Sequence, residues 1–359
     1  MRPGLDNVIA AETVLSHVDG EAGRLIIRGH DLEDLAGHAT YEQATALLWD
    51  GFVADTADLT TFRARLGAAR AKAFVRFTPL ATQLKGLTAT EAMRLLLSAV
   101  PDGEEENEPV DVLAAAAVAA AFAIRATAGL SAVAPDVSLS HTADLLRMIR
   151  GKAASTDDVQ AFETYLVTII DHGLNASTFA ARVVASTAAR VPSAIVAALC
   201  ALKGPLHGGA PGPVLDMLDA IATPANADAW IADALKRGER LMGFGHRVYR
   251  VRDPRANVLK TTVAKFKGRA NRVTFAEAVE AAALRALRDF KSERRLDTNV
   301  EFYTALLLEA LDIPRTGFTP VFAAGRTAGW IAHAKEQEQT GRLIRPQSRY
   351  IGPWPVQAA

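Results

Sequence analysis

The sequence TDDVQAFETYLVTIIDHGLNAS, residues 156–177, carries the clearest structural signal of the chain. A threonine and two aspartates open it, which is typical of the first turn of a helix because negative charge complements the helix dipole. Polar groups that suit ligand binding follow, at His172, Asn175 and Ser177. The apolar residues between recur at spacings of three and four, which predicts an amphipathic helix with one buried face: Val159, Phe162, Leu166, Ile169 and Ile170.

Helical patterns extend over most of the chain on both sides of this stretch. Thr40 to Gln43 forms a capping-box pattern that predicts a helix ending at Gly51. The alanine-rich run 112–124 is shorter than the roughly 20 residues that span a bilayer, so we expect a buried helix. On its N-terminal side, Glu104–Glu106 and Glu108 either complement the helix dipole or form a solvated loop. Further helices are predicted near residues 138–150, 177–188, 194–202, 226–237, 275–290 and 299–311.

Strand signals are scarce and concentrate near the N-terminus. Residues 14–27 form the best candidate, with Asp19-Gly20 as a hairpin turn. No alternation of strands and helices follows, which argues against a doubly wound sheet. The sequence therefore predicts an all-α fold with a minor N-terminal β ribbon.

Composition excludes several classes of protein. The 359 residues carry 40 Lys+Arg and 40 Asp+Glu, so no overall field attracts a polyanion, and we expect no nucleic-acid partner. Half of the residues are hydrophobic, which is ample for a core, and the length suggests two domains at about 150 residues each. The first residues contain no apolar secretory segment, so a cytoplasmic protein without membrane attachment is expected.

The single cysteine, Cys200, lies in the apolar run IVAALCALK, where a core thiol is expected rather than a nucleophile. One cysteine forms neither an intrachain disulfide nor a cysteine-based zinc site, which fits a reducing compartment. The sequence also lacks a phosphate-binding loop, H-E-x-x-H and G-x-S-x-G, and Gly243-Phe-Gly245 lacks the third glycine of a dinucleotide fingerprint. Nucleotide triphosphatases, dinucleotide dehydrogenases, zincins and serine hydrolases thus lose support.

Three further clusters carry a chemical signal. His207 is flanked by glycines that let a substrate approach the backbone, although a structural histidine is an equal alternative. The segment 243–255 holds four arginines against one aspartate, which suits a polycarboxylate or a phosphorylated carrier unless it is only a solvated basic face. The C-terminal part adds an acid, Glu301, and two arginines, Arg326 and Arg345.

Read together, these segments resemble the citrate synthase family. The resemblance covers nearly the whole chain, and its specificity comes from the order and spacing of its motifs. They are VDGEAGRLIIRGHDL at 18–32, HGLNAST at 172–178, GPLHGGA at 204–210, GFGHRVY at 243–249 and LIRP at 343–346. The resemblance implies a two-domain helical fold, with a large domain of residues 1–208 and 316–359. It also implies a small closing domain of residues 209–315, a homodimer, small-molecule substrates and no cofactor or metal.

The family pattern also implies a role for individual residues. An acyltransferase of this kind joins acetyl-CoA to oxaloacetate and hydrolyses citryl-CoA. Glu301 occupies the base position, His207 would bind the thioester oxygen, and His246 would polarise the oxaloacetate carbonyl. The oxaloacetate carboxylates would be held by His172, Arg255, Arg326 and Arg345, the last from the partner subunit. Arg240 and Arg250 fall where the family contacts CoA phosphates.

One position departs from the usual family pattern. The common Asn-Val-Asp-Phe-Tyr is Asn-Val-Glu-Phe-Tyr here, so Glu301 is one methylene longer than the usual base, as in some minor bacterial relatives. A displacement near 1 Å costs about a hundredfold in a near-attack geometry. Three readings stay open: citrate synthase, 2-methylcitrate synthase acting on propionyl-CoA, and a catalytically weakened paralogue that binds oxaloacetate or CoA. Motifs do not separate the first two, because one methylene is worth only about 1–3 kcal/mol.

Overall fold

The computed structural model describes residues 3–5, 8–103, 107–207, 211–246, 248–266, 271–290 and 296–354. Within these ranges the protein is predominantly helical with one small sheet, which confirms the predicted fold class. The acidic residues Glu104–Glu106 and the cluster member Arg247 lie outside the described residues, as do Gly208–Ala210 after His207.

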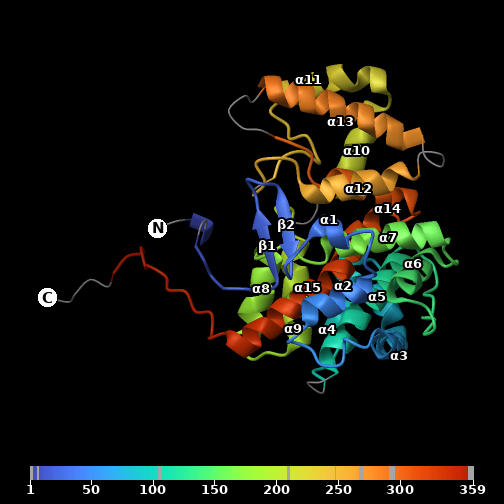
Figure 1. The fold of residues 1–359 in the computed structure, drawn as a ribbon, viewed down its shortest axis with the longest axis vertical. Helices are drawn as coiled ribbons and strands as arrows, with labels where there is room; N and C mark the ends of the chain where they lie inside the picture. Colours follow the sequence, from blue (N-terminus) through green and yellow to red (C-terminus); the bar gives the residue numbers. More distant parts are fainter. Residues whose placement is uncertain are drawn as a thin grey trace.

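The helices form a large lower body and a smaller upper layer (Figure 1). The lower body contains α1 Leu32–Leu35, α2 Tyr41–Trp49, α3 Leu59–Phe77, α4 Ala89–Ser98, α5 Glu108–Thr127, α6 His141–Arg150, α7 Thr156–Ile169, α8 Ala176–Ala185, α9 Val191–Leu202 and α15 Phe318–Thr340. The upper layer contains α10 Pro211–Ile221, α11 Ala227–Lys236, α12 Pro254–Ala264, α13 Asn271–Phe290 and α14 Val300–Ala310.

Helix starts follow the local capping signals. The Thr40 hydroxyl oxygen accepts from the backbone amide of Gln43, and the side-chain oxygen of Gln43 accepts from the backbone amide of Thr40. The predicted capping box is therefore present at α2. α7 begins at Thr156 as predicted, with the Ser155 hydroxyl as its cap. These caps satisfy backbone donors that would otherwise be unpaired at the helix ends.

The N-terminal ribbon is larger than the sequence predicts. Strands β1 Ser16–Asp19 and β2 Arg24–Ile27 pair antiparallel, with Asp19 opposite Arg24, and a short β3 His30–Asp31 adds to β2. Asp19-Gly20 therefore only begins the connection, which runs through residues 20–23. The Asp19 carboxylate accepts from the amides of residues 21 and 22, which stabilises this longer turn.

The alanine-rich helix α5 is the centre of the lower body. Every residue from Val112 to Ile124 is at most 4% exposed, which confirms the predicted buried helix. In the described chain α5 alone has the length and mean hydropathy of a membrane span, yet 78% of that window is buried inside the protein. Small alanine side chains let α3, α4, α6, α9 and α15 pack closely around it.

The expectation for Cys200 was wrong, because this cysteine is exposed. It lies on α9, whose Ala198, Leu199 and Leu202 are buried. The apolar run reads as uniformly buried in sequence, but one side of the helix that it forms faces outward in this single chain.

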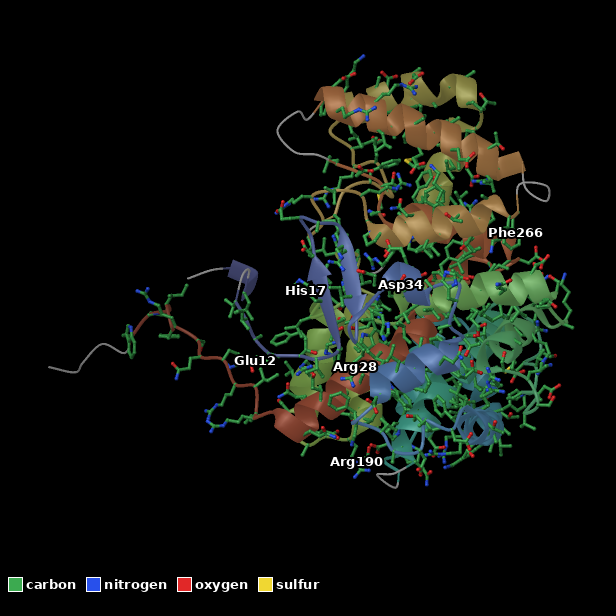
Figure 2. The ribbon with its side chains drawn as sticks, viewed as in Figure 1. Glu12, His17, Arg28, Asp34, Arg190 and Phe266 are labelled. Atoms are coloured by element: carbon green, nitrogen blue, oxygen red, sulfur yellow. The ribbon has the colours of Figure 1, made fainter. Side chains whose placement is uncertain are left out.

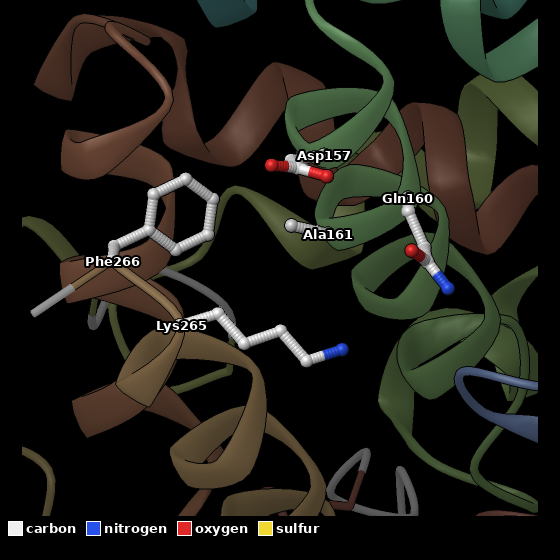
Figure 3. Close-up of a pocket in the computed structure, with 5 residues that line it drawn as sticks. All are labelled: Asp157, Gln160, Ala161, Lys265 and Phe266. Carbon is white, nitrogen blue, oxygen red and sulfur yellow. The ribbon is translucent and has the colours of Figure 1, made fainter.

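The upper layer rests on the lower body through α12 and α7, which run antiparallel. The start of α7 meets the end of α12 at a small cavity lined by Asp157, Gln160 and Ala161 on one side and by Lys265 and Phe266 on the other (Figure 3). Figure 2 places Phe266 at the level where the two parts of the molecule meet. At 1.5 Å per residue, this cavity lies roughly 18 Å along α7 from its other end.

The described residues near the two ends of the chain, Pro3–Leu5 and 341–354, lie away from the other helices on the same side of the molecule (Figure 1). After α15, residues 341–354 form no helix or strand, and Leu343, Tyr350, Ile351 and Trp354 are exposed there. The Ile344 amide donates to the Ser186 hydroxyl, which fixes the start of this tail at the end of α8.

Candidate active site

His172 lies at the end of α7 that is remote from the cavity. The chain turns at Gly173, whose φ is 58°, and Asn175 then caps α8 by accepting from the amides of Ser177 and Thr178. His172 is left 9% exposed, with its Nε2 3.2 Å from the Tyr249 hydroxyl. Burial, together with the charges of two arginines, holds the pKa of His172 well below its usual range, so this imidazole is neutral.

A buried polar chain supports His172 from behind. The carboxylate of Asp171 receives the Nε2 hydrogen of His333, with Nε2 3.3 Å from Oδ2, and also the hydroxyl hydrogen of Ser16. The Nδ1 of His333 accepts from Arg182, 2.8 Å away, since an arginine only donates. Burial opposes the charge of Asp171, but His333, Arg326 and Ser16 outweigh it and lower the pKa of this carboxyl.

Arg255 reaches the same place from α12. Asp253 caps this helix and binds the Arg255 side chain twice, at 3.0 Å to Nε and 2.8 Å to Nη2. Asp253 also accepts from the Val300 amide at 3.2 Å, so one carboxylate joins the starts of α12 and α14. Arg255 is 4% exposed, and burial opposes its charge, but the charge and hydrogen bonds of Asp253 together with Tyr249 and Glu301 raise its pKa.

His246 is presented by a loop with two left-handed glycines. Gly243 has φ 85°, and a Cβ there would lie 2.9 Å from the Cβ of Phe302, so only glycine fits. The Nδ1 of His246 accepts from the amides of Val248 and Tyr249, each at 3.1 Å. Its hydrogen is therefore on Nε2.

Electrostatics keeps His246 neutral as well. Burial and then the charge of Arg255 lower its pKa to about 4, against a smaller opposing effect of Asp253. The His246 ring lies 5.6 Å from that of His172 and 4.8 Å from that of Tyr249, centre to centre. An uncharged donor is thus fixed beside Arg255, which suits the polarisation of a carbonyl group.

His207 has the opposite tautomer. Its Nε2 accepts from the Ser177 amide at 3.2 Å and lies 2.9 Å from the Ser177 hydroxyl, so the hydrogen is on Nδ1. The Ser177 hydroxyl in turn accepts from Trp330 of α15. Burial and then the charge of Arg326 lower the pKa of His207, so it too is a neutral donor.

Glu301 and Arg326 complete the cluster. Asn299 caps α14 and accepts from the Glu301 amide at 3.0 Å, which leaves the carboxyl at the first turn of the helix. Burial raises the pKa of Glu301 to about 7, although Arg255 and Arg326 act in the other direction. Burial likewise lowers the pKa of Arg326 to about 10, which still leaves it charged at neutral pH.

Six of the predicted residues therefore occupy one region: His172, His207, His246, Arg255, Glu301 and Arg326. Three others do not join them. Arg240 and Arg250 are exposed, and Arg345 is exposed in the C-terminal tail. The arginine cluster 243–255 also divides, because Arg252 binds Glu280 at 2.8 Å instead of facing the site. In the described part of the chain, no three His, Cys, Asp or Glu side chains gather as a metal site would require.

Sequence reasoning missed the residues that support this cluster. Asp171 lies inside the stretch 156–177, but its partner His333 is 162 residues away, and no pattern in the sequence around His333 indicates this contact. Tyr249 belongs to the GFGHRVY motif and contacts His172, which the spacing alone does not reveal. Asp253 was counted only as a charge, whereas it orients Arg255.

Comparisons with known proteins agree on one family. The family model "Citrate synthase, C-terminal domain" matches residues 4–347. A citrate synthase of Haloferax volcanii is 38% identical over 371 residues, covering 98% of this chain and 96% of its own. A 2-methylcitrate synthase of Mycobacterium tuberculosis is 32% identical over 360 residues, covering 98% and 91%.

Solved structures agree with the sequence comparisons. The crystal structure of citrate synthase from Thermotoga maritima superposes with a TM-score of 0.86 at 32% identity, covering 100% of this chain and 98% of that chain. The similarity therefore extends over the lower body and the upper layer alike.

Proposed function

The chain belongs to the citrate synthase family, and we propose that it condenses acetyl-CoA with oxaloacetate and hydrolyses the resulting citryl-CoA to citrate and CoA. Family membership makes it an enzyme of the acyltransferase type. The observation that carries the assignment of roles is one cluster of two neutral imidazole donors, a carboxyl whose pKa is about 7, and two buried arginines.

Glu301 would remove the proton from the acetyl methyl group. That group is a very weak acid, so the enolate must be stabilised while it forms. The C–H electron pair becomes the C=C bond of the enolate while the π pair of the thioester carbonyl moves to its oxygen, and the Nδ1 hydrogen of His207 binds this oxygen. Burial supports the role of Glu301, because a carboxylate with a pKa near 7 is a stronger base than an exposed one.

His246 would act on the second substrate. Its Nε2 hydrogen polarises the oxaloacetate carbonyl while the enolate carbon attacks, and the alkoxide formed takes that proton. Arg255 and Arg326, with His172, hold the carboxylates, since guanidinium groups bind them through paired hydrogen bonds. Water then cleaves the thioester and releases CoA, which makes the sequence practically irreversible. No metal or cofactor takes part in these steps.

Arg345 would enter the site from a second subunit. The tail that carries it leaves its own helices, so a homodimer supplies the missing carboxylate ligand in this proposal. A mixed dimer tests it: one subunit carries Arg345→Ala and the other His246→Ala. If Arg345 is shared, one site keeps both groups and the other lacks both, so activity near half that of wild type should return. Little activity would show that Arg345 serves its own chain, because each site would then lack one group.

Residues 209–315 would form a small domain that closes over the substrates. Its Arg255 and His246 and the large domain's Arg326 and His172 share one ligand, so oxaloacetate should draw the two parts together before acyl-CoA binds. Solution scattering should show compaction with oxaloacetate, and calorimetry should show tighter acetyl-CoA binding. An unchanged scattering profile and affinity would contradict closure. Arg240 and Arg250 would contact the CoA phosphates.

A second candidate is 2-methylcitrate synthase, which the similarity to the Mycobacterium tuberculosis enzyme favours. The two reactions differ by one methyl group in the acyl pocket. A thiol-release assay with oxaloacetate and either acetyl-CoA or propionyl-CoA separates them by the ratio of kcat/KM. Absence of turnover with both substrates would leave the third reading, a weakened paralogue that binds oxaloacetate or CoA. A cytoplasmic location stays a prediction.

A further inference from the structure

Three buried polar atoms around Glu301 have no hydrogen-bond partner among the described residues. They are Oε2 of Glu301 itself, the hydroxyl of Tyr165 and Nη2 of Arg326. A buried polar group without a partner costs stability, so such groups are rare unless a ligand or a movement satisfies them. Oxaloacetate accounts for Nη2 of Arg326 in the proposed reaction. The other two atoms remain, and one is a donor and the other an acceptor.

Tyr165 comes from the other side of the boundary between the two parts of the molecule. It lies on α7, is fully buried, and stacks on Phe162 with ring centres 6.2 Å apart. α7 packs against α14, the helix of Glu301. The carboxylate of Glu301 lies close enough that, after burial, its charge is the main factor that raises the pKa of the Tyr165 hydroxyl.

We propose that Tyr165 is a positioning residue, whose hydroxyl donates to Oε2 of Glu301 when oxaloacetate closes the site. This inference rests on the proposed function, because it assigns Glu301 as the base. The bond satisfies both unpartnered atoms at once. It also explains how a base one methylene longer than usual is held in place, since the extra torsion of glutamate would otherwise leave the carboxylate mobile.

The other charged groups around Glu301 do not replace this bond. Asp253 and Arg255 at the start of α12 bind each other, and Arg326 of α15 donates through Nε to the Ile169 carbonyl. α10 also packs on α14, but its Asp216 and Asp219 bind Arg315. Among the described residues of the helices that pack on α14, Tyr165 thus offers a buried donor with neither a partner nor another assigned role.

Removal of the hydroxyl has a predictable sign. A hydrogen bond to the carboxylate favours the charged form and lowers the pKa of Glu301. Tyr165→Phe should therefore reduce kcat about tenfold, leave the KM for oxaloacetate unchanged, and move the acidic limb of the kcat profile up by about one pH unit. In the Glu301→Asp background the same change should alter kcat less than twofold, because the shorter acid does not reach the hydroxyl.

Tyr41→Phe is the matched control. Its hydroxyl is also buried, on α2, but donates to the Gly325 carbonyl at 2.9 Å. This variant loses a formed hydrogen bond, so its Tm should fall more than that of Tyr165→Phe, while the acidic limb stays in place. Tyr41→Phe should thus show the larger fall in Tm, and Tyr165→Phe the larger shift of the acidic limb.

A second measurement does not need turnover. The protonated carboxyl band of Glu301 is followed by infrared spectroscopy with and without oxaloacetate, with Glu301→Gln as the reference. The titration midpoint with oxaloacetate should be lower in wild type than in Tyr165→Phe. Equal midpoints would overturn the proposal even if the enzyme turned over normally. A raised oxaloacetate KM with an unmoved acidic limb would also overturn it, by assigning the hydroxyl to the substrate. An enzyme inactive with both acyl-CoA substrates but with shifted midpoints would reject the proposed function alone.

Discussion

The two halves of the site hold their side chains in different ways. Arg326 and His172 belong to helices of the lower body, and the Asp171–His333 pair behind them is fully buried. His246 belongs to a loop fixed mainly by backbone bonds, in which Gly245 donates to the Asp297 carbonyl and Asn299 donates to that of Gly243. The charged groups of the lower half are therefore held in place by buried contacts between helices. The hydrogen bonds of the upper half lie within that half, so it is able to move as one piece without losing its geometry.

The largest effect should come from Glu301, the proposed base, on which charged groups of both halves act. Glu301→Gln keeps shape and polarity but removes the proton acceptor, so kcat should fall roughly a thousandfold, within the range for loss of a general base. In wild type the rate should rise with pH through about 7, the pKa of Glu301, and this limb should be lost in the variant. The measurement is solvent deuterium exchange into the acetyl-CoA methyl group, with turnover as a check.

Glu301→Asp is the control for that experiment. A backbone adapted to the longer acid leaves aspartate too short, so we expect a loss rather than a gain. An equally active glutamine variant would remove Glu301 from the mechanism. An inactive wild type rescued by aspartate would favour the weakened-paralogue reading.

The next effect tests whether the lower half is a rigid frame. Asp171→Asn removes the charge from a buried pair, which should cost about 3 kcal/mol of unfolding free energy at pH 7. The pKa of Asp171 is below its ordinary value of 3.8, so its contribution is complete above that pH and is lost as pH falls through the lower folded value. Urea unfolding between pH 3 and 7 should show a flatter acid dependence in the variant. Identical slopes would mean that the pKa of Asp171 is the same in the folded and the unfolded protein.

Arg326→Lys addresses charge geometry in the same half. Lysine keeps the charge but loses the planar fork that binds a carboxylate through two bonds, so oxaloacetate affinity should fall about thirtyfold. Calorimetry with oxaloacetate measures it, and the Tm should change little. Arg315→Lys, on a surface ion pair with Asp216, is the matched control and should leave affinity unaltered. Wild-type affinity in Arg326→Lys would exclude direct carboxylate binding.

The smallest effect is expected at the edge of the upper half. The backbone amide of Arg250 donates to the Gly20 carbonyl of the ribbon. The Arg250 side chain is exposed, and no hydrogen bond or ion pair is seen for it among the described residues. Arg250→Ala should raise the KM for acetyl-CoA about threefold and leave that for oxaloacetate unchanged, because an exposed ion pair is worth little. A larger change in the oxaloacetate KM would place this arginine in the site itself.

Local signals explain how much of this could be predicted. α7 and the capping box of α2 depend on neighbours within a few residues, and both were predicted. The exposure of Cys200 could not be predicted, because an apolar run does not indicate which side of its helix is exposed to solvent. Arg326 was singled out as a charge, but its carboxylate-binding role came only from the family resemblance, because the residues around it on α15 are apolar and show no single face.

The site could be predicted only in part for the same reason. Glycines flank His207 and His246, and such flanks are visible in sequence. His333 and Tyr165 lie in helical patterns that look like ordinary packing, and their roles depend on contacts between distant helices. Long-range pairs of this kind leave no trace in a single sequence.

The opposite tautomers of His207 and His246 have a spectroscopic consequence. In each ring the accepting nitrogen is fixed by backbone amides, so one carries hydrogen on Nδ1 and the other on Nε2. Nitrogen-15 resonances of the two rings should therefore show mirrored patterns, each with one pyrrole-like and one pyridine-like nitrogen. The pattern of His246 should persist down to about pH 5, above its pKa of about 4. The site offers two hydrogen atoms to its substrates while storing no imidazolium charge, so substrate binding should release or take up almost no protons at these rings.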